Sequence, residues 1–147
     1  MLNAVVQIEM TKICLLKADI LRLHLTFKNI NMRTLRTIAQ DLQAWYHNLP
    51  PSMHLETSGE EELSADTSHT IMHVHLLYLG AIQLLHRRIA SQYLRSYRLK
   101  SAASPSPMCA IMMEHNLEAS QAAALSARTL NLLLEDSCVF KRCWLVV

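Results

Sequence analysis

Glycine and proline are scarce in this chain, with two glycines and four prolines in 147 residues. Folds with many tight turns depend on these residues, so a β-sandwich or a β-barrel is not expected. The common residues include Leu, Ala, Met, Gln and Arg, which are good helix formers. Hydrophobic residues make up 51% of the chain, enough to argue against disorder throughout. The sequence therefore predicts an all-α fold of about one domain.

Apolar residues recur at helical spacing in four segments. The predicted helices cover approximately residues 4–25, 32–49, 67–98 and 108–135. A one-sided apolar stripe is typical of a helix that packs against a core. Asn29 or Asn31 is expected to cap the second helix, and Pro50 and Pro51 are expected to end it. These segments predict an irregular antiparallel bundle of about four main helices.

The third predicted helix contains the stretch "SHTIMHVHLLYLGAIQLLHRRIA", residues 68–90, which has four histidines. Its core face is expected to consist of Ile71, Val74, Tyr78, Ala81, Leu85 and Ile89, with the imidazoles on the remaining surface. Gly80 lies in the middle of the helix, where glycine costs about 1 kcal/mol relative to alanine, so a close helix crossing is expected there. The apolar run falls short of the roughly 20 residues needed to span a bilayer, and no membrane segment is expected.

The segments between and after the helices have different compositions. Residues 50–66 combine Pro, Gly, Ser and a Glu triplet, which favours an exposed, mobile loop over an acidic docking site. Residues 100–108 form a second linker. The chain ends on the apolar sequence "CVFKRCWLVV", and a globular domain rarely exposes such a stretch. Residues 1–147 are therefore expected to be part of a larger helical domain.

Candidate metal ligands are few. Asp66, His69 and His73 can share one helical face, but no residue that would orient the imidazoles can be named and no metalloprotease pattern accompanies them, so a metal site is not favoured. The four cysteines fit no zinc framework and are expected to be reduced core thiols or inert thiols. They are Cys14, Cys109, Cys138 and Cys143.

Signals for catalysis and for nucleic-acid binding are also weak. Cys109 and His115 are close in sequence but lack a nucleophile elbow, and the carboxylates at residues 60–62 fall in the exposed loop. Two glycines are too few for a phosphate-binding loop. The net charge is +2, and the basic residues are scattered instead of clustered on one face. We expect no enzymatic activity, no cofactor and no direct contact with DNA.

The second and third predicted helices resemble a known family. "LRTIAQDLQAWYHNLPPSMHL" resembles a segment of the fungal-specific transcription factor domain, and the matching residues are Leu42, Trp45, Leu49 and Pro50. This domain is the middle homology region of fungal zinc binuclear-cluster regulators. "HLLYLGAIQLLHRRIA" resembles the next helix of that domain through Tyr78, Leu85, His86 and Arg87.

The match extends over approximately residues 8–147, with three departures. Arg88 stands where the family often has proline. In the last helix, Asn116 stands where the family usually has cysteine, and Ala119–Ser120 replaces an Ala-Ala pair. These departures affect the assignment to a subfamily more than the fold.

The resemblance implies a regulatory domain of a nuclear transcription factor. The family holds zinc and contacts DNA through a separate N-terminal cluster of six cysteines, which this chain does not contain. Regulation is then expected through protein partners, intramolecular domains or a small-molecule effector. Tyr78, His86 and Arg87 are the candidate effector-binding residues, although Tyr78 is also a typical core residue and Arg87 a typical helix-crossing residue. The alternative is a stand-alone helical interaction module without enzymatic activity.

Overall fold

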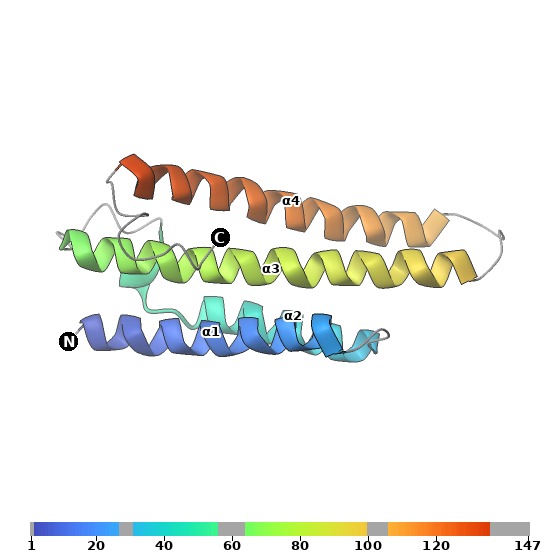
Figure 1. Cartoon of the computed structure of the whole chain (residues 1–147), viewed down its shortest axis with the longest axis horizontal. Helices are drawn as coiled ribbons and strands as arrows, with labels where there is room; N and C mark the ends of the chain where they lie inside the picture. Colours follow the sequence, from blue (N-terminus) through green and yellow to red (C-terminus); the bar gives the residue numbers. More distant parts are fainter. Residues whose placement is uncertain (1, 27–30, 56–63, 100–105, 136–147) are drawn as a thin grey trace.

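Four helices account for nearly all of the described residues of the computed structural model, which are 2–26, 31–55, 64–99 and 106–135. They are α1 (Leu2–Thr26), α2 (Met32–His47), α3 (Ala65–Leu99) and α4 (Ser106–Glu135), with a short 3-10 helix, η1 (Pro51–Met53), after α2. Each α-helix runs antiparallel to the one before it (Figure 1). The predicted all-α bundle is confirmed, and each predicted helix end lies within two residues of the observed one.

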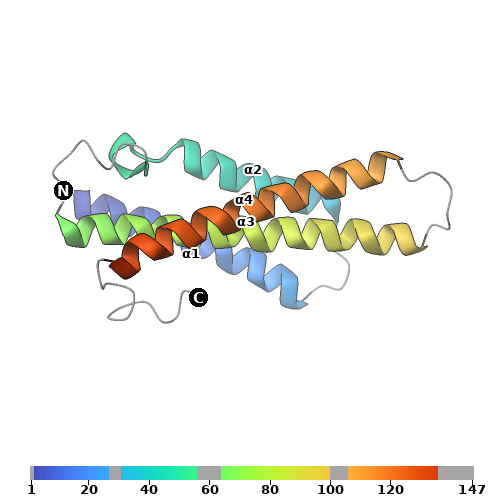
Figure 2. The same ribbon diagram turned by 90° about the horizontal axis from the view of Figure 1, so that it is seen from above.

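The long helix α3 is the central element of the bundle. Its 35 residues span about 50 Å at 1.5 Å per residue. Helix α4 crosses one face of α3, and α1 and α2 lie on the other side (Figures 1 and 2). The predicted core stripe is confirmed, because its residues are all buried. These are Ile71, Val74, Tyr78, Ala81, Leu85 and Ile89.

The expected placement of the imidazoles on the surface of α3 is wrong for two of them. His73 and His75 are buried, and His75 is only 2% exposed. Leu76 and Leu79 are buried as well. A helix that is covered on several sides buries more than one stripe. The central position of α3 therefore explains why these polar rings lie inside the protein.

A buried carboxylate joins α1 to α2. Glu9 lies between Val6 and Ile13 on the apolar stripe of α1, and only 9% of its surface is exposed. The indole Nε1–H of Trp45 donates a hydrogen bond to its Oε2 at 3.0 Å, and Lys12 Nζ lies 2.7 Å from its Oε1. Burial of a carboxylate is tolerated when both oxygens have partners. Glu9 thus fixes the position of Trp45 within the core.

The helix starts follow from local side-chain capping. Asn31 precedes α2, and its side chain accepts a hydrogen bond from the backbone N–H of Arg33 at 2.9 Å, which confirms one of the two predicted caps. Ser64 precedes α3, and its hydroxyl lies 2.8 Å from the hydroxyl of Thr67. Thr67 in turn donates to the side chain of Asn3 at 3.1 Å. The start of α3 is therefore attached to the start of α1.

Both ends of the segment predicted as an exposed loop belong to helices. Residues 51–53 form η1, and Met53 is fully buried, because a long apolar side chain next to α3 gains more from burial than from exposure. Ala65 and Asp66 belong to α3. The Glu triplet at residues 60–62 lies outside the described residues, as do Cys138, Cys143 and the apolar C-terminal sequence. Among the described helices, none has the length and apolar character that a bilayer-spanning segment needs.

Replacement of Trp45 by alanine is expected to be strongly destabilising. The variant leaves a cavity and removes the donor that satisfies the buried carboxylate of Glu9. We expect the free energy of unfolding to fall by about 3–5 kcal/mol, measured by urea denaturation monitored by circular dichroism. A loss below about 1 kcal/mol, the size typical of a partly solvated site, would contradict this burial.

The mid-helix Gly80 does not mark the expected crossing of two backbones. The nearest atoms to a Cβ at this position are in the side chain of Lys17, with Nζ at 3.0 Å and Cε at 3.5 Å. Partial burial lowers the pKa of this amine below its usual value. The far end of a lysine side chain is flexible and can move away from an added methyl group.

Replacement of Gly80 by alanine is consequently expected to stabilise the protein. Alanine is favoured over glycine in a helix interior by up to about 1 kcal/mol, and only the Lys17 side chain has to shift. The thermal midpoint of the variant, compared with that of wild type, checks this expectation. A lower midpoint would mean that the α1–α3 contact is too tight to adjust.

Candidate functional site

A groove runs along the flank of α3 that lies between α2 and α4. Both helices pack on α3, whereas they make no extensive contact with each other. Two adjacent cavities of about 240 and 250 Å³ occupy this space. Tyr78, Ile82 and Glu118 line both cavities and form their shared wall. We call the two cavities and this wall the α2/α4 groove.

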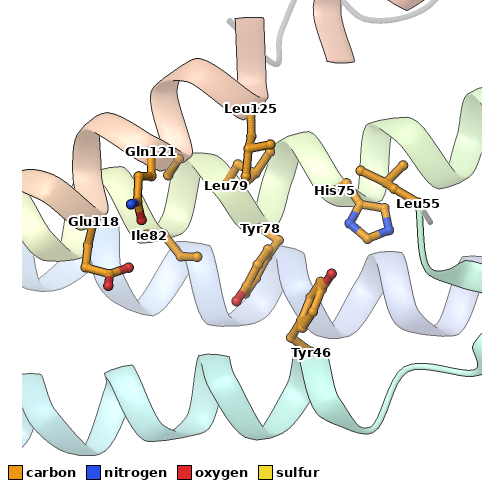
Figure 3. Close-up of a pocket in the computed structure, with 10 residues that line it drawn as sticks. Tyr46, Leu55, His75, Tyr78, Leu79, Ile82, Glu118, Gln121 and Leu125 are labelled. Carbon is orange, nitrogen blue, oxygen red and sulfur yellow. The ribbon is translucent and has the colours of Figure 1, made fainter. Parts of the chain in front are cut away.

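One end of the α2/α4 groove is aromatic and apolar. Figure 3 shows Tyr78 projecting from α3 towards α2, and Tyr46 projecting from α2 beside it. The two rings are stacked, with centroids 4.9 Å apart. Leu79, on α3, and Leu125, on α4, add apolar surface to the same cavity. Such a lining, with few polar groups, is typical of sites for small organic molecules.

Buried hydrogen bonds and ring contacts hold this end in place. His75 Nε2 lies 2.7 Å from the backbone oxygen of Met53, so its N–H donates to that carbonyl and η1 is attached to α3. The ring of Tyr46 lies edge-on to His75 at 6.0 Å. Trp45 contacts Tyr78 from the core side at 5.4 Å. The aromatic wall is therefore continuous with the core.

Burial also determines the protonation of Tyr78. The loss of solvent, with smaller contributions from Tyr46 and from the carboxylate of Glu118, raises the pKa of its phenol to about 12. The hydroxyl is thus neutral at physiological pH and can donate or accept a hydrogen bond. The residue that carries this hydroxyl, Tyr78, lines both cavities.

The other end of the α2/α4 groove holds a pair of histidines. His86 on α3 and His115 on α4 lie with their Nδ1 atoms 3.0 Å apart, so that one ring donates its Nδ1–H to the lone pair of the other. The ring of Tyr93 stacks on His115 at 6.2 Å. A second polar contact between the same helices is made by Gln83, whose Nε2 donates to Ser126 Oγ at 3.0 Å.

Both members of this pair are held neutral. Burial lowers the pKa of His86, and the charge of His115 lowers it further. Burial also lowers the pKa of His115, with a smaller contribution from Arg36 of α2. Glu114 and Glu118 oppose these effects on both rings. A neutral pair is what a single N–H···N bond requires, because a doubly protonated pair has no acceptor.

The charged groups along the described lining of the groove are acidic. Glu114 and Glu118 lie on α4, and Glu118 reaches both cavities. Figure 3 shows the Glu118 side chain projecting from α4 into the space above α2. Among the described residues it forms no hydrogen bond or salt bridge shorter than 4.0 Å. Among the described residues, the groove thus combines aromatic rings with carboxylates that no lysine or arginine contacts within 4.0 Å.

The three residues predicted to bind an effector are placed differently. Tyr78 lines both cavities and His86 lines the second, so the structure brings these two to one groove. Arg87 follows His86 on α3 but is exposed and lines neither cavity. Adjacent residues on a helix point about 100° apart, which separates Arg87 from His86.

The remaining candidates from the sequence do not form a site. No group of three metal-ligating side chains occurs in the part of the chain that the structure describes, and this includes Asp66, His69 and His73. His115 pairs with His86, and the side chain of Cys109 lies outside the described residues. Cys14 is exposed, so of the two expected alternatives, a core residue or an inert thiol, the first is wrong for Cys14.

Sequence patterns miss several groove residues. Tyr46, His115 and Glu118 are separated from Tyr78 by 32, 37 and 40 positions, well beyond the three- or four-residue spacing that reports proximity on one helix. The only signal in the sequence is that each lies in an amphipathic helix of a chain predicted to be a bundle.

Comparisons of the chain with protein-family models, with curated proteins and with solved structures found no match.

The stability of the protein is expected to fall in mild acid. Burial lowers the pKa of four histidines in the folded state, namely His73, His75, His86 and His115. Below their ordinary pKa of 6.5 the unfolded chain therefore binds more protons than the folded chain, and the free energy of unfolding decreases as pH falls. Urea midpoints between pH 7.5 and 5 measure the slope.

Two variants locate the origin of this pH dependence. Replacement of both His86 and His115 by glutamine is expected to reduce the slope, while replacement of the exposed His47 leaves it unchanged. A wild-type midpoint that is flat over this range would contradict the burial of these rings. A His47 variant that reduces the slope as much as the double variant does would also contradict the burial of these rings.

Proposed function

We propose that this chain is a non-enzymatic regulatory domain, or part of one, from a fungal zinc-cluster-type transcription factor. It acts in the nucleus, and a separate zinc cluster of the same protein contacts DNA. In this proposal the α2/α4 groove receives an effector or a segment of a partner, and its occupancy controls transcription. The chain itself needs no cofactor for this role.

The observation that carries the proposal is that the two stretches resembling the family meet at one groove. Leu42 and Trp45 come from the first stretch, and Tyr78, Leu85 and His86 from the second. Trp45 packs against the ring of Tyr78, and Leu42, Leu85 and His86 line the second cavity together. Residues that carry the resemblance thus form a wall of the groove and the core beneath it.

The arrangement of the helices suits control by an occupant. Helices α2 and α4 are each held by α3 and make no extensive contact with each other. A molecule in the groove contacts both α2 and α4. It therefore stabilises the arrangement of these two helices to which it binds best. An equilibrium between two arrangements responds only to a ligand that binds one of them better.

A reporter assay in yeast tests the proposed function. The chain is inserted between an unrelated zinc-cluster DNA-binding domain and an acidic activation domain, and reporter expression is compared with a fusion that lacks the chain. We expect the chain to change reporter output at equal protein level, and His86→Ala to alter that effect. Equal output with and without the chain contradicts the proposal.

Arg87 provides a sharp comparison within the same assay. The sequence resemblance places it with His86, whereas the geometry places it outside both cavities. We expect Arg87→Ala to behave as wild type. If Arg87→Ala acts and His86→Ala does not, effector contact lies on the exposed face of α3 instead of in the groove.

One observation favours the alternative of a stand-alone interaction module. Large apolar side chains are exposed on α1 and α4, and some repeat at intervals of seven residues, which places them on one helix face. These pairs are Ile8 with Leu15, and Leu125 with Leu132. Contiguous exposed apolar surface often marks protein contacts. Loss of partner capture in an Ile8→Lys, Leu15→Lys variant, with groove variants unaffected, supports this alternative.

A further inference from the structure

We propose that the effector bound in the α2/α4 groove is a small organic cation with an apolar, aromatic body. This inference rests on the proposed function, since it names the ligand class for the same groove. It is argued from the shape, the lining and the charge of the two cavities.

The volume of the groove favours a small molecule. The two cavities measure about 240 and 250 Å³ and share the wall made by Tyr78, Ile82 and Glu118. Sites for small molecules are concave and measure roughly 300–1,000 Å³, a range that the two cavities reach together but neither reaches alone. Within this wall, Tyr78 and Ile82 belong to α3 and Glu118 belongs to α4. A ligand of one or two rings with a short chain can extend from one cavity into the other.

The lining separates an apolar end from a charged end. Leu79, Ile82 and Leu125 surround the first cavity together with the stacked rings of Tyr46 and Tyr78. An aromatic ring placed there exchanges water for apolar and ring contacts. Glu118 lies where the first cavity joins the second, and Glu114 lies further along the second. An aromatic body at the first end thus directs its chain towards carboxylates.

The charge of the groove selects a cation. Burial keeps His75, His86 and His115 neutral at pH 7, so they do not balance the carboxylates. The field of Glu118 extends along the groove, since it raises the pKa of Tyr78, His86 and His115. Arg36 of α2 acts on His115 from outside the linings of both cavities. An anionic ligand would therefore face like charge, whereas an ammonium group is attracted by Glu118 and by the tyrosine rings.

Three related probes differ in the charge of their end group. Tryptamine, tryptophol and indole-3-propionate share an indole ring and a two-carbon chain, and end in an ammonium, a hydroxyl and a carboxylate. Each is titrated into the purified full-length chain at pH 7.5, and binding is followed by NMR shifts of backbone amides. We expect shifts at Tyr78, Ile82 and Glu118, and an affinity for tryptamine about tenfold higher than for tryptophol. Tenfold corresponds to about 1.4 kcal/mol, which is within the range that one opposite charge near a protein surface contributes.

Matched variants of α4 identify the carboxylate responsible. Glu118→Gln keeps the size and helix propensity of an exposed residue, and is expected to abolish the preference for tryptamine over tryptophol. Glu135→Gln, on the same helix but outside both cavities, is expected to bind as wild type. Circular dichroism establishes that both variants are folded. Equal affinity for the three probes, shifts outside the groove, no binding up to the solubility limit, or an unchanged preference in Glu118→Gln each overturns the inference.

The binding assay and the reporter assay fail independently. Preference for tryptamine in the groove without any effect of the chain on reporter output supports the ligand class and overturns the regulatory role. Reporter control through His86, together with equal binding of the three probes, supports the regulatory role and overturns the ligand class.

Discussion

The burial of α3 on more than one side is the condition on which the other features of this structure depend. Apolar side chains on an isolated helix of this length would face water, and each one gains about 1.5–3 kcal/mol when it is removed from it. Helices α1 and α2 cover one part of α3, and α4 covers another. The Trp45–Tyr78 contact and the buried ring of His75 are consequences of that enclosure. The groove forms where the cover is incomplete, between α2 and α4.

The polar groups inside this enclosure define how the helices fit together. Glu9 accepts from Trp45 across α1 and α2, and His75 donates to Met53 across α3 and η1. A buried polar group without a partner is costly, so each pair favours a single register of the two elements that it joins. Apolar packing alone tolerates small shifts along a helix. These two hydrogen bonds therefore add specificity to a core that is mostly Leu and Ile.

The sequence was sufficient to predict the helices, their bounds and much of the core. Spacing of three and four residues reports which side chains share a face, and it placed Ile71, Tyr78 and Leu85 inside. It does not show that α3 is covered on several sides, so it wrongly predicts His75 at the surface. Glu9 stands in the apolar stripe of α1, but its burial depends on Trp45, which is 36 positions away. Of the groove residues, the sequence predicts only Tyr78 and His86, because periodicity carries no information on which helices are neighbours.

The attachment of α4 has a further consequence for local unfolding. Ala122, Thr129 and Leu133 are its buried residues within the described part, and several of its leucines are exposed. Regions with few buried apolar contacts open with a smaller free energy than the whole protein. Backbone amides of α4 should therefore exchange with deuterium sooner than those of α3. An outward movement of α4 would widen the space beside Tyr78, because Glu118, Gln121 and Leu125 of α4 line that cavity.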